Sequence, residues 1–170
     1  MDDCEKNCSP KALSALKKNE ALGNHILKNF GFLIKEHSFD LTFEGMSRGW
    51  AFVFNKDNFS IYLCISMEDK LPLIWISHET KTHYSQLSIE EIAQKLDGKG
   101  NLFKYETSAK IDDLNFIKKI SFRKKNKSLL EKEYDRKIEE TGHFISLNLK
   151  AILALVRNLP IEKPITTRKL

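Results

Sequence analysis

The stretch that most constrains the fold runs from Trp50 to Thr80, where strand-like alternation of apolar and polar side chains is strongest. A period of two puts successive side chains on opposite faces of a β-strand, so that one face can be buried. Between Asn58 and Met67 the two faces carry Phe59, Ile61, Leu63 and Ile65 on one side, and Ser60, Tyr62, Cys64 and Ser66 on the other. We expect a strand here with one face in the core.

Three other segments read as strands and lie close to this one in the sequence. They are Phe39–Phe43, Trp50–Phe54 and Leu71–Ser77, and polar turn residues at 55–58 and 67–70 flank the central strand. Connections this short pair neighbouring strands in an antiparallel manner. The sequence therefore predicts an antiparallel meander of about four strands, one face of which must be covered by helices.

Apolar stripes with helical spacing lie on both sides of the strands. The first begins at Ser9 and Pro10, a capping residue followed by a residue suited to the first turn. We expect this helix to be interrupted or weakened at Gly23 and to end with Gly31 as a left-handed cap. The second runs from residue 128 to residue 159, with a kink or break expected at Gly142. The expected fold is α+β, with the meander packed against an N-terminal helix and a long C-terminal helix.

Two shorter helices are expected between the strands and the long helix. Ser88 and Glu91 have the spacing of a capping box, and the helix that they begin should stop within residues 97–100. A second helix should begin near Ile111, with Asp112 and Asp113 at its positive N-terminal end.

Length and composition are those of an ordinary globular protein, with 170 residues, 41% hydrophobic and 30% charged. This length suits one domain, expected at residues 1–160, followed by a flexible basic tail at residues 161–170. No apolar run approaches the roughly 20 residues that cross a bilayer. The chain begins with acidic residues and has three cysteines, an odd number. We therefore expect a cytoplasmic protein with no disulfide framework and no membrane partner.

No motif in the sequence indicates a catalytic or metal site. His78 and His83 are five residues apart, whereas the zinc-protease helix needs histidines four apart, and on a strand the two would lie on opposite faces. Cys64 is expected to pack beneath a helix rather than to act as a nucleophile. We expect no catalytic residue, no metal and no cofactor, and hence a protein that is not an enzyme.

Charge is distributed unevenly along the chain. Residues 1–100 contain 12 Lys and Arg against 14 Asp and Glu, a balance of −2, and residues 101–170 contain 16 against 9, a balance of +7. Clustered basic residues neutralise phosphates, and Phe116 and Phe122 are able to stack on bases. Nucleic-acid binding is therefore one hypothesis, and a solvated helix face is the other explanation. The basic residues concerned are Lys118, Lys119, Arg123, Lys124, Lys125 and Lys127.

The order of the elements resembles that of a known group of proteins. Phe30-Gly31-Phe32 follows a helix, the meander and a Ser88-capped helix come next, and a long helix with Leu130 and Tyr134 closes the series. This order resembles small bacterial immunity proteins of contact-dependent growth inhibition and related polymorphic toxin systems. The resemblance implies a protein that binds one cognate toxin domain and occludes its active site. It covers most of the chain, and no functional residue can be carried over position by position.

The resemblance leaves the contact surface open. Inhibitors of nucleases, one candidate class of such toxins, are expected to be acidic, whereas this chain has a net charge of +5. Either the acidic contacts are local, or the toxin surface is acidic and meets the basic run at residues 118–127. The local acidic candidates for partner binding are Asp57, Glu68, Asp69, Glu79, Glu90 and Glu91.

Overall fold

The structure is a computed structural model of the whole chain, and it describes residues 6–46, 49–66, 71–98, 103, 105–112, 114 and 116–160. The predicted tail at residues 161–170 lies outside these. The elements, in order, are α2 (Pro10–Lys18), α3 (Glu20–Lys35), β1 (Asp40–Met46), β2 (Gly49–Lys56), β3 (Phe59–Ser66), β4 (Leu73–Glu79), β5 (Tyr84–Ser88), α4 (Ile89–Asp97), α5 (Glu106–Asp112), α6 (Phe116–Lys125) and α7 (Lys127–Arg157).

The five strands form one antiparallel sheet in the order β1-β2-β3-β4-β5, so the predicted meander and the α+β class are confirmed. The strand that the sequence did not reveal is β5. Its residues are Tyr-Ser-Gln-Leu-Ser, and Leu87 is its only aliphatic side chain. A segment this short and polar resembles a loop until its pairing with β4 is known.

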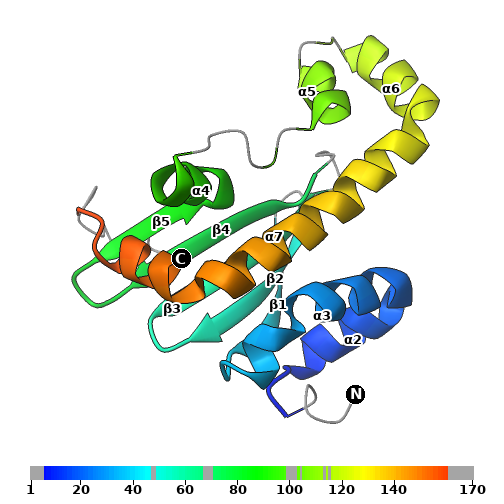
Figure 1. Cartoon of the computed structure of the whole chain (residues 1–170). Coiled ribbons are helices and arrows are strands. Elements are labelled where there is room, and N and C mark those ends of the chain that lie inside the picture. Colours follow the sequence, from blue (N-terminus) through cyan, green and yellow to red (C-terminus); the bar gives the residue numbers. More distant parts are fainter. Residues whose placement is uncertain are drawn as a thin grey trace.

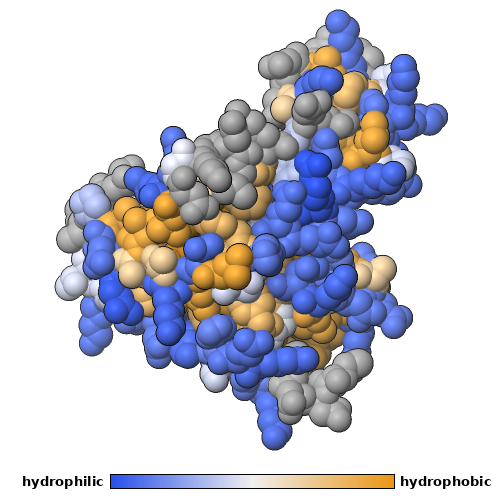
Figure 2. All heavy atoms as spheres, in the orientation of Figure 1, coloured by the Kyte–Doolittle hydropathy of each residue, from blue (hydrophilic) through white to orange (hydrophobic). Residues whose placement is uncertain are grey.

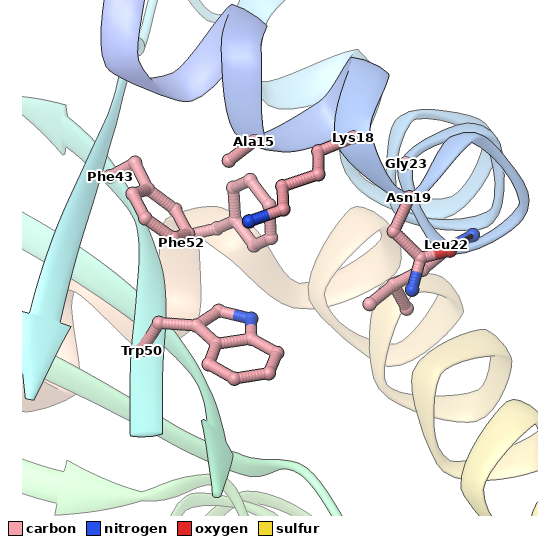
Figure 3. Close-up of a pocket in the computed structure, with 8 residues that line it drawn as sticks. All are labelled: Ala15, Lys18, Asn19, Leu22, Gly23, Phe43, Trp50 and Phe52. Atoms are coloured by element: carbon pink, nitrogen blue, oxygen red, sulfur yellow. Dashed lines mark hydrogen bonds between the residues drawn. The ribbon is translucent and has the colours of Figure 1, made fainter. Parts of the chain in front are cut away.

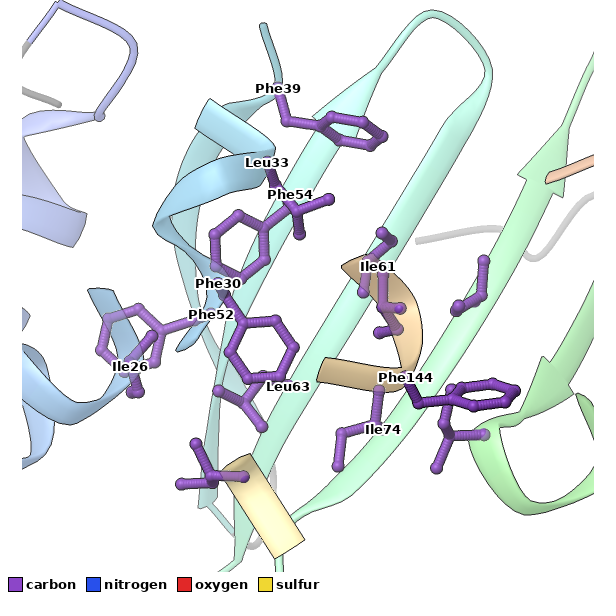
Figure 4. Close-up of a cluster of buried hydrophobic side chains, with 14 of the residues drawn as sticks. Ile26, Phe30, Leu33, Phe39, Phe52, Phe54, Ile61, Leu63, Ile74 and Phe144 are labelled. Carbon is purple, nitrogen blue, oxygen red and sulfur yellow. The ribbon is translucent and has the colours of Figure 1, made fainter. Parts of the chain in front are cut away.

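Helices α2, α3, α4 and α7 cover one face of the sheet and enclose the core against it. Figure 1 shows α7 crossing in front of the sheet, with α2 and α3 beside β1 and β2, and α4 beside β5. The rings of Phe30 in α3 and Phe54 in β2 stack with their centroids 5.8 Å apart. Ile61, Leu63 and Ile74 point from the central strands into the same cluster (Figure 4). This cluster confirms the expectation that one set of alternating residues lies in the core.

The N-terminal stripe differs from the prediction in two places. The helix is interrupted, but at Asn19 rather than at Gly23, and Asn19 caps α3 by accepting the Leu22 amide at 3.3 Å. Gly31 is not a left-handed cap but an interior residue of α3, which continues to Lys35. The helix continues because Leu33 and Ile34 extend the buried stripe by another turn.

Three predictions about the second half of the chain can also be compared with the structure. The Ser88–Glu91 capping box is present, and α4 ends before Gly98, which has a φ of 63°. The helix predicted to begin near Ile111 is wrong, since α5 ends at Asp112 and a separate helix, α6, follows. Asp112 therefore lies at a C-terminal end, and Asp113 lies outside the described residues.

The long helix α7 is continuous through Gly142, so the predicted break is absent. Gly142 lies against α3, where a Cβ atom at this position would be 2.5 Å from the backbone oxygen of Asn29. The glycine thus permits the close approach of two helices. α5, α6 and residues 127–136 of α7, which we call the arm, stand away from the sheet in Figure 1.

We predict opposite effects for two Gly→Ala substitutions. Gly31→Ala should raise the free energy of unfolding by about 0.5–1 kcal/mol, because a Cβ there meets nothing within 4 Å and Ala favours helix. Gly142→Ala should lower it by about 1–3 kcal/mol, because α3 and α7 must separate. Urea unfolding of both variants checks this. Destabilisation by Gly31→Ala would instead indicate the left-handed cap.

Candidate functional site

The face of the sheet turned away from the helices, which we call the open face, is built from strand residues alone in the described part of the chain. Its small apolar cluster consists of Ala51, Val53 and Cys64, with Tyr62 packed against them. Polar groups beside the cluster are joined across strands. Asn55 donates to the Thr42 hydroxyl at 3.0 Å and accepts from the Ser60 hydroxyl at 2.7 Å. The open face is therefore held in one arrangement without a covering layer.

Large apolar side chains remain exposed on this face. Leu73 and Trp75 alternate along β4 and are 39% and 36% exposed, and Tyr84 on β5 is 39% exposed. Trp75 lies opposite Tyr62 across the β3–β4 pair. Sequence reasoning missed these residues, although consecutive apolar residues from Leu73 to Ile76 indicate a strand with two apolar faces. Exposed aromatic and aliphatic groups that share one face of a sheet are typical of contact surfaces.

The charged strand residues on the open face are all acidic in the part of the chain that the structure describes. Asp40 and Glu44 alternate along β1, and Glu79 ends β4 opposite Tyr84. Burial, followed by the nearby Tyr62 and Glu79, raises the pKa of the Tyr84 phenol. The open face thus combines exposed aromatic rings with negative charge, which suits a basic partner.

The six acidic residues predicted from the sequence do not form one cluster. Asp57 lies in the β2–β3 turn beside Asn58, whose carbonyl accepts the Glu79 amide at 2.8 Å, so Asp57 and Glu79 share one end of the sheet. Glu90 and Glu91 lie at the start of α4, after the opposite end of β5. Glu68 and Asp69 lie outside the described residues.

Glu90 and Glu91 already have partners within the molecule. The Glu90 carboxylate accepts from the ammonium of Lys137 at 2.7 Å, and the Lys137 side chain is only 5% exposed. The Glu91 carboxylate closes the capping box by accepting the Ser88 amide. Removal of Glu90 would leave a buried charge unpaired, so its evident role is to join α4 to α7. That either residue contacts a partner stays a prediction.

The predicted basic residues lie on the arm, five of them in α6 and Lys127 at the start of α7. At 3.6 residues per turn they are distributed around the helix rather than gathered on one face. Phe122 is half-buried, whereas Ile120 and Leu129 are exposed. Figure 2 shows hydrophilic side chains along the arm, with hydrophobic ones among them toward its outer part. The arm is thus a second charged surface, separate from the open face.

The two histidines tested as metal ligands come closer than the sequence indicates. His83 lies in the turn after β4 rather than on the strand, and its ring centroid is 5.8 Å from that of His78. A buried nitrogen of each ring, Nδ1 of His78 and Nε2 of His83, has no hydrogen-bond partner among the described residues. A structural zinc site needs four ligands. No group of three or more His, Cys, Asp or Glu in the described chain is placed to hold a metal.

The environment of Cys64 also differs from the prediction. The residue packs with Ala51 and Val53 on the open face, not beneath a helix. Burial, followed by the charge of Glu44, raises the pKa of its thiol. A raised pKa keeps the thiol protonated at neutral pH, whereas a nucleophile needs the thiolate.

Comparisons with known proteins return nothing: no family model matches the chain, and neither a curated protein nor a solved structure is significantly similar to it. Among the helices in the described residues, none is both long enough and apolar enough to cross a membrane. The surfaces of the molecule therefore carry the functional inference.

We predict that stability falls as the pH is lowered from 7 to 5. Burial, followed by His83 and Arg157, lowers the pKa of His78 from its ordinary value of 6.5. Below pH 6.5 the unfolded chain binds a proton that the folded protein resists, so the free energy of unfolding falls, by at most about 1.4 kcal/mol per pH unit for this group. Urea unfolding at several pH values checks this. His78→Phe should flatten the profile, whereas His143→Gln on the exposed side of α7 should not.

Proposed function

We propose that the protein is a non-enzymatic binding protein whose open face holds a basic protein domain. By the resemblance in the order of its elements, that domain is a cognate toxin, and binding neutralises the toxin by occluding its active site. One observation carries the proposal: exposed Leu73, Trp75 and Tyr84 share a face on which the charged strand residues of the described chain are all acidic.

The chemistry of the open face supports a protein as the occupant. Aromatic residues provide most of the binding energy at protein interfaces when they enter pockets of a partner, and charges around them speed association and set the choice of partner. Trp75 and Tyr84 would provide the binding energy, and Glu44 and Glu79 would speed association and set the choice of partner. The fixed network of Thr42, Asn55 and Ser60 reduces the entropy lost on binding.

The size of the open face indicates how far the partner extends. Five strands of about seven residues make a surface of roughly 20 Å by 25 Å, or roughly 500 Å². A stable interface buries about 800 Å² on each partner. The partner would therefore reach beyond the strands, and the turn with Asp57 beside Glu79 continues the acidic surface in one direction.

The test uses the protein encoded next to this chain in its genome as the candidate toxin. We expect its expression to arrest cells, and co-expression of this chain to restore growth. Calorimetry should then show Trp75→Ala weakening the complex at least about tenfold, since a buried aromatic anchor is lost. Glu79→Lys should slow association, because the new positive charge repels the basic surface of the partner.

Two controls separate the open face from other surfaces. Leu147→Ala removes a side chain that is 70% exposed on α7, and Lys124→Glu with Lys125→Glu alters the arm. Neither change should alter affinity or protection. A complex insensitive to Trp75→Ala and Glu79→Lys would contradict the open face as the contact surface. A neighbouring protein that does not harm cells would contradict the antidote role.

A second candidate function, nucleic-acid binding, is favoured by the arm alone. Six basic residues and no acidic residue occur between Phe116 and Lys127, on helices that stand away from the sheet. The alternative predicts retention on RNA or heparin that weakens steeply with salt, because phosphate contacts release counterions. Lys124→Glu with Lys125→Glu should abolish retention, whereas Lys17→Glu with Lys28→Glu, an equal charge change elsewhere, should not. Equal losses would indicate a net-charge effect only.

A further inference from the structure

A cavity lies on the helix side of the sheet, between the α2–α3 junction and strands β1 and β2. It has a volume of about 350 Å³, at the lower end of the range of about 300–1,000 Å³ for small-molecule sites. Figure 3 shows the cavity between the helix junction and the strands. Its lining is mostly apolar and consists of Ala15, Lys18, Asn19, Leu22, Gly23, Phe43, Trp50 and Phe52. The cavity shares no residue with the open face or the arm.

Aromatic rings form the sheet side of the cavity. The rings of Phe43 and Phe52 meet edge to face with centroids 5.2 Å apart, and Trp50 precedes Phe52 by two residues on the same face of β2. On β1 the residue opposite Trp50 is Gly45, which has no side chain to pack beside the indole, whereas Ile65 lies opposite Trp50 on β3. The strands thus leave an aromatic surface uncovered where a second apolar group could lie.

The helix side of the cavity is shaped by the way α2 and α3 meet. A Cβ atom on Gly23 would lie 2.5 Å from the backbone oxygen of Leu16, so close packing of α2 against α3 requires glycine here. The division of the helix at Asn19 brings the end of α2 and the start of α3 to the rim together. The space is therefore a consequence of how these helices meet.

Two polar side chains lie at this apolar cavity. Lys18 extends toward Phe43 and Phe52 in Figure 3, and it has no ion-pair partner among the residues that the structure describes. The Asn19 side chain accepts the Leu22 amide through Oδ1, which leaves its Nδ2 hydrogens for another acceptor. Both groups offer donors, and one of them is positively charged.

We propose that this cavity binds a small organic carboxylate whose apolar body, one ring or a short chain, packs on Trp50, Phe43 and Phe52. The carboxylate accepts hydrogen bonds from Lys18 and Asn19. A charge-assisted bond to Lys18 sets the preference for an anion, and the aromatic surface sets the preference for an apolar body. The inference is independent of the proposed partner at the open face.

The test follows the fluorescence of Trp50. The chain has two tryptophans, so Trp75→Phe makes Trp50 the only one. Three probes of one size are titrated into this variant: 3-phenylpropanoate, 3-phenylpropanol and 3-phenylpropylamine. We expect saturable changes in emission, with the carboxylate binding about tenfold tighter than the alcohol and the amine weakest.

Variants then assign the two parts of the site. Lys18→Met should weaken the carboxylate about tenfold and leave the alcohol unchanged, whereas Lys17→Met, the neighbouring lysine outside the cavity, should leave both unchanged. Ala15→Leu should fill the cavity and abolish binding of all three probes. If Ala15→Leu does not fold, Lys18→Met on an exposed side chain still carries the test. Absence of saturable binding, equal affinity for the three probes, or a preference that survives Lys18→Met would overturn the proposal.

Discussion

The structure depends on covering the sheet from one side only. The close approach of α3 and α7 at Gly142 brings both helices over β2, β3 and β4, and their apolar stripes fill the space above Phe54, Leu63 and Ile74. In the described chain the other face receives no helix and must be stable against water by itself. Short side chains such as Ala51 and Val53, packed against Tyr62, meet this requirement. The bonded side chains of Thr42, Asn55 and Ser60 lie beside them. Leu73 and Trp75 contribute nothing to this shielding and remain exposed. Their exposure makes the open face the candidate contact surface.

Strong alternation of apolar and polar residues made much of the fold predictable. The sequence-based predictions that were wrong concern segments where that alternation is absent. β2, β3 and β4 carry enough aromatic and β-branched residues for the period of two to stand out, and the Ser88 box begins α4 by local chemistry alone. β5 has no such signal, because its pairing partner rather than its composition makes it a strand. Gly31 was misjudged for a related reason: a glycine before Phe32 favours a cap locally, but burial of Leu33 and Ile34 outweighs the cost of glycine within a helix.

The candidate site was less predictable than the fold, because it depends on which residues meet. The sequence places Glu91 in the capping box by local spacing, whereas the bond between Glu90 and Lys137 joins positions 47 residues apart and leaves no local pattern. The exposure of Trp75 follows from its register with Tyr62 and from knowing which face the helices cover. Neither fact can be read from β4 alone, since both of its faces are apolar.

A net charge of +5 is unfavourable for binding a basic partner, but the spatial separation of the charges removes that difficulty. The basic residues from Lys118 to Lys127 stand on the arm, whereas Asp40, Glu44 and Glu79 lie on the open face. At physiological ionic strength, exposed charges more than about 8 Å apart are largely screened from one another. A partner that approaches the open face therefore meets a locally acidic surface, whatever the total charge of the chain. The sign of a whole sequence predicts solubility and nonspecific adhesion, but a docking surface is selected by the few charges within a screening length of it.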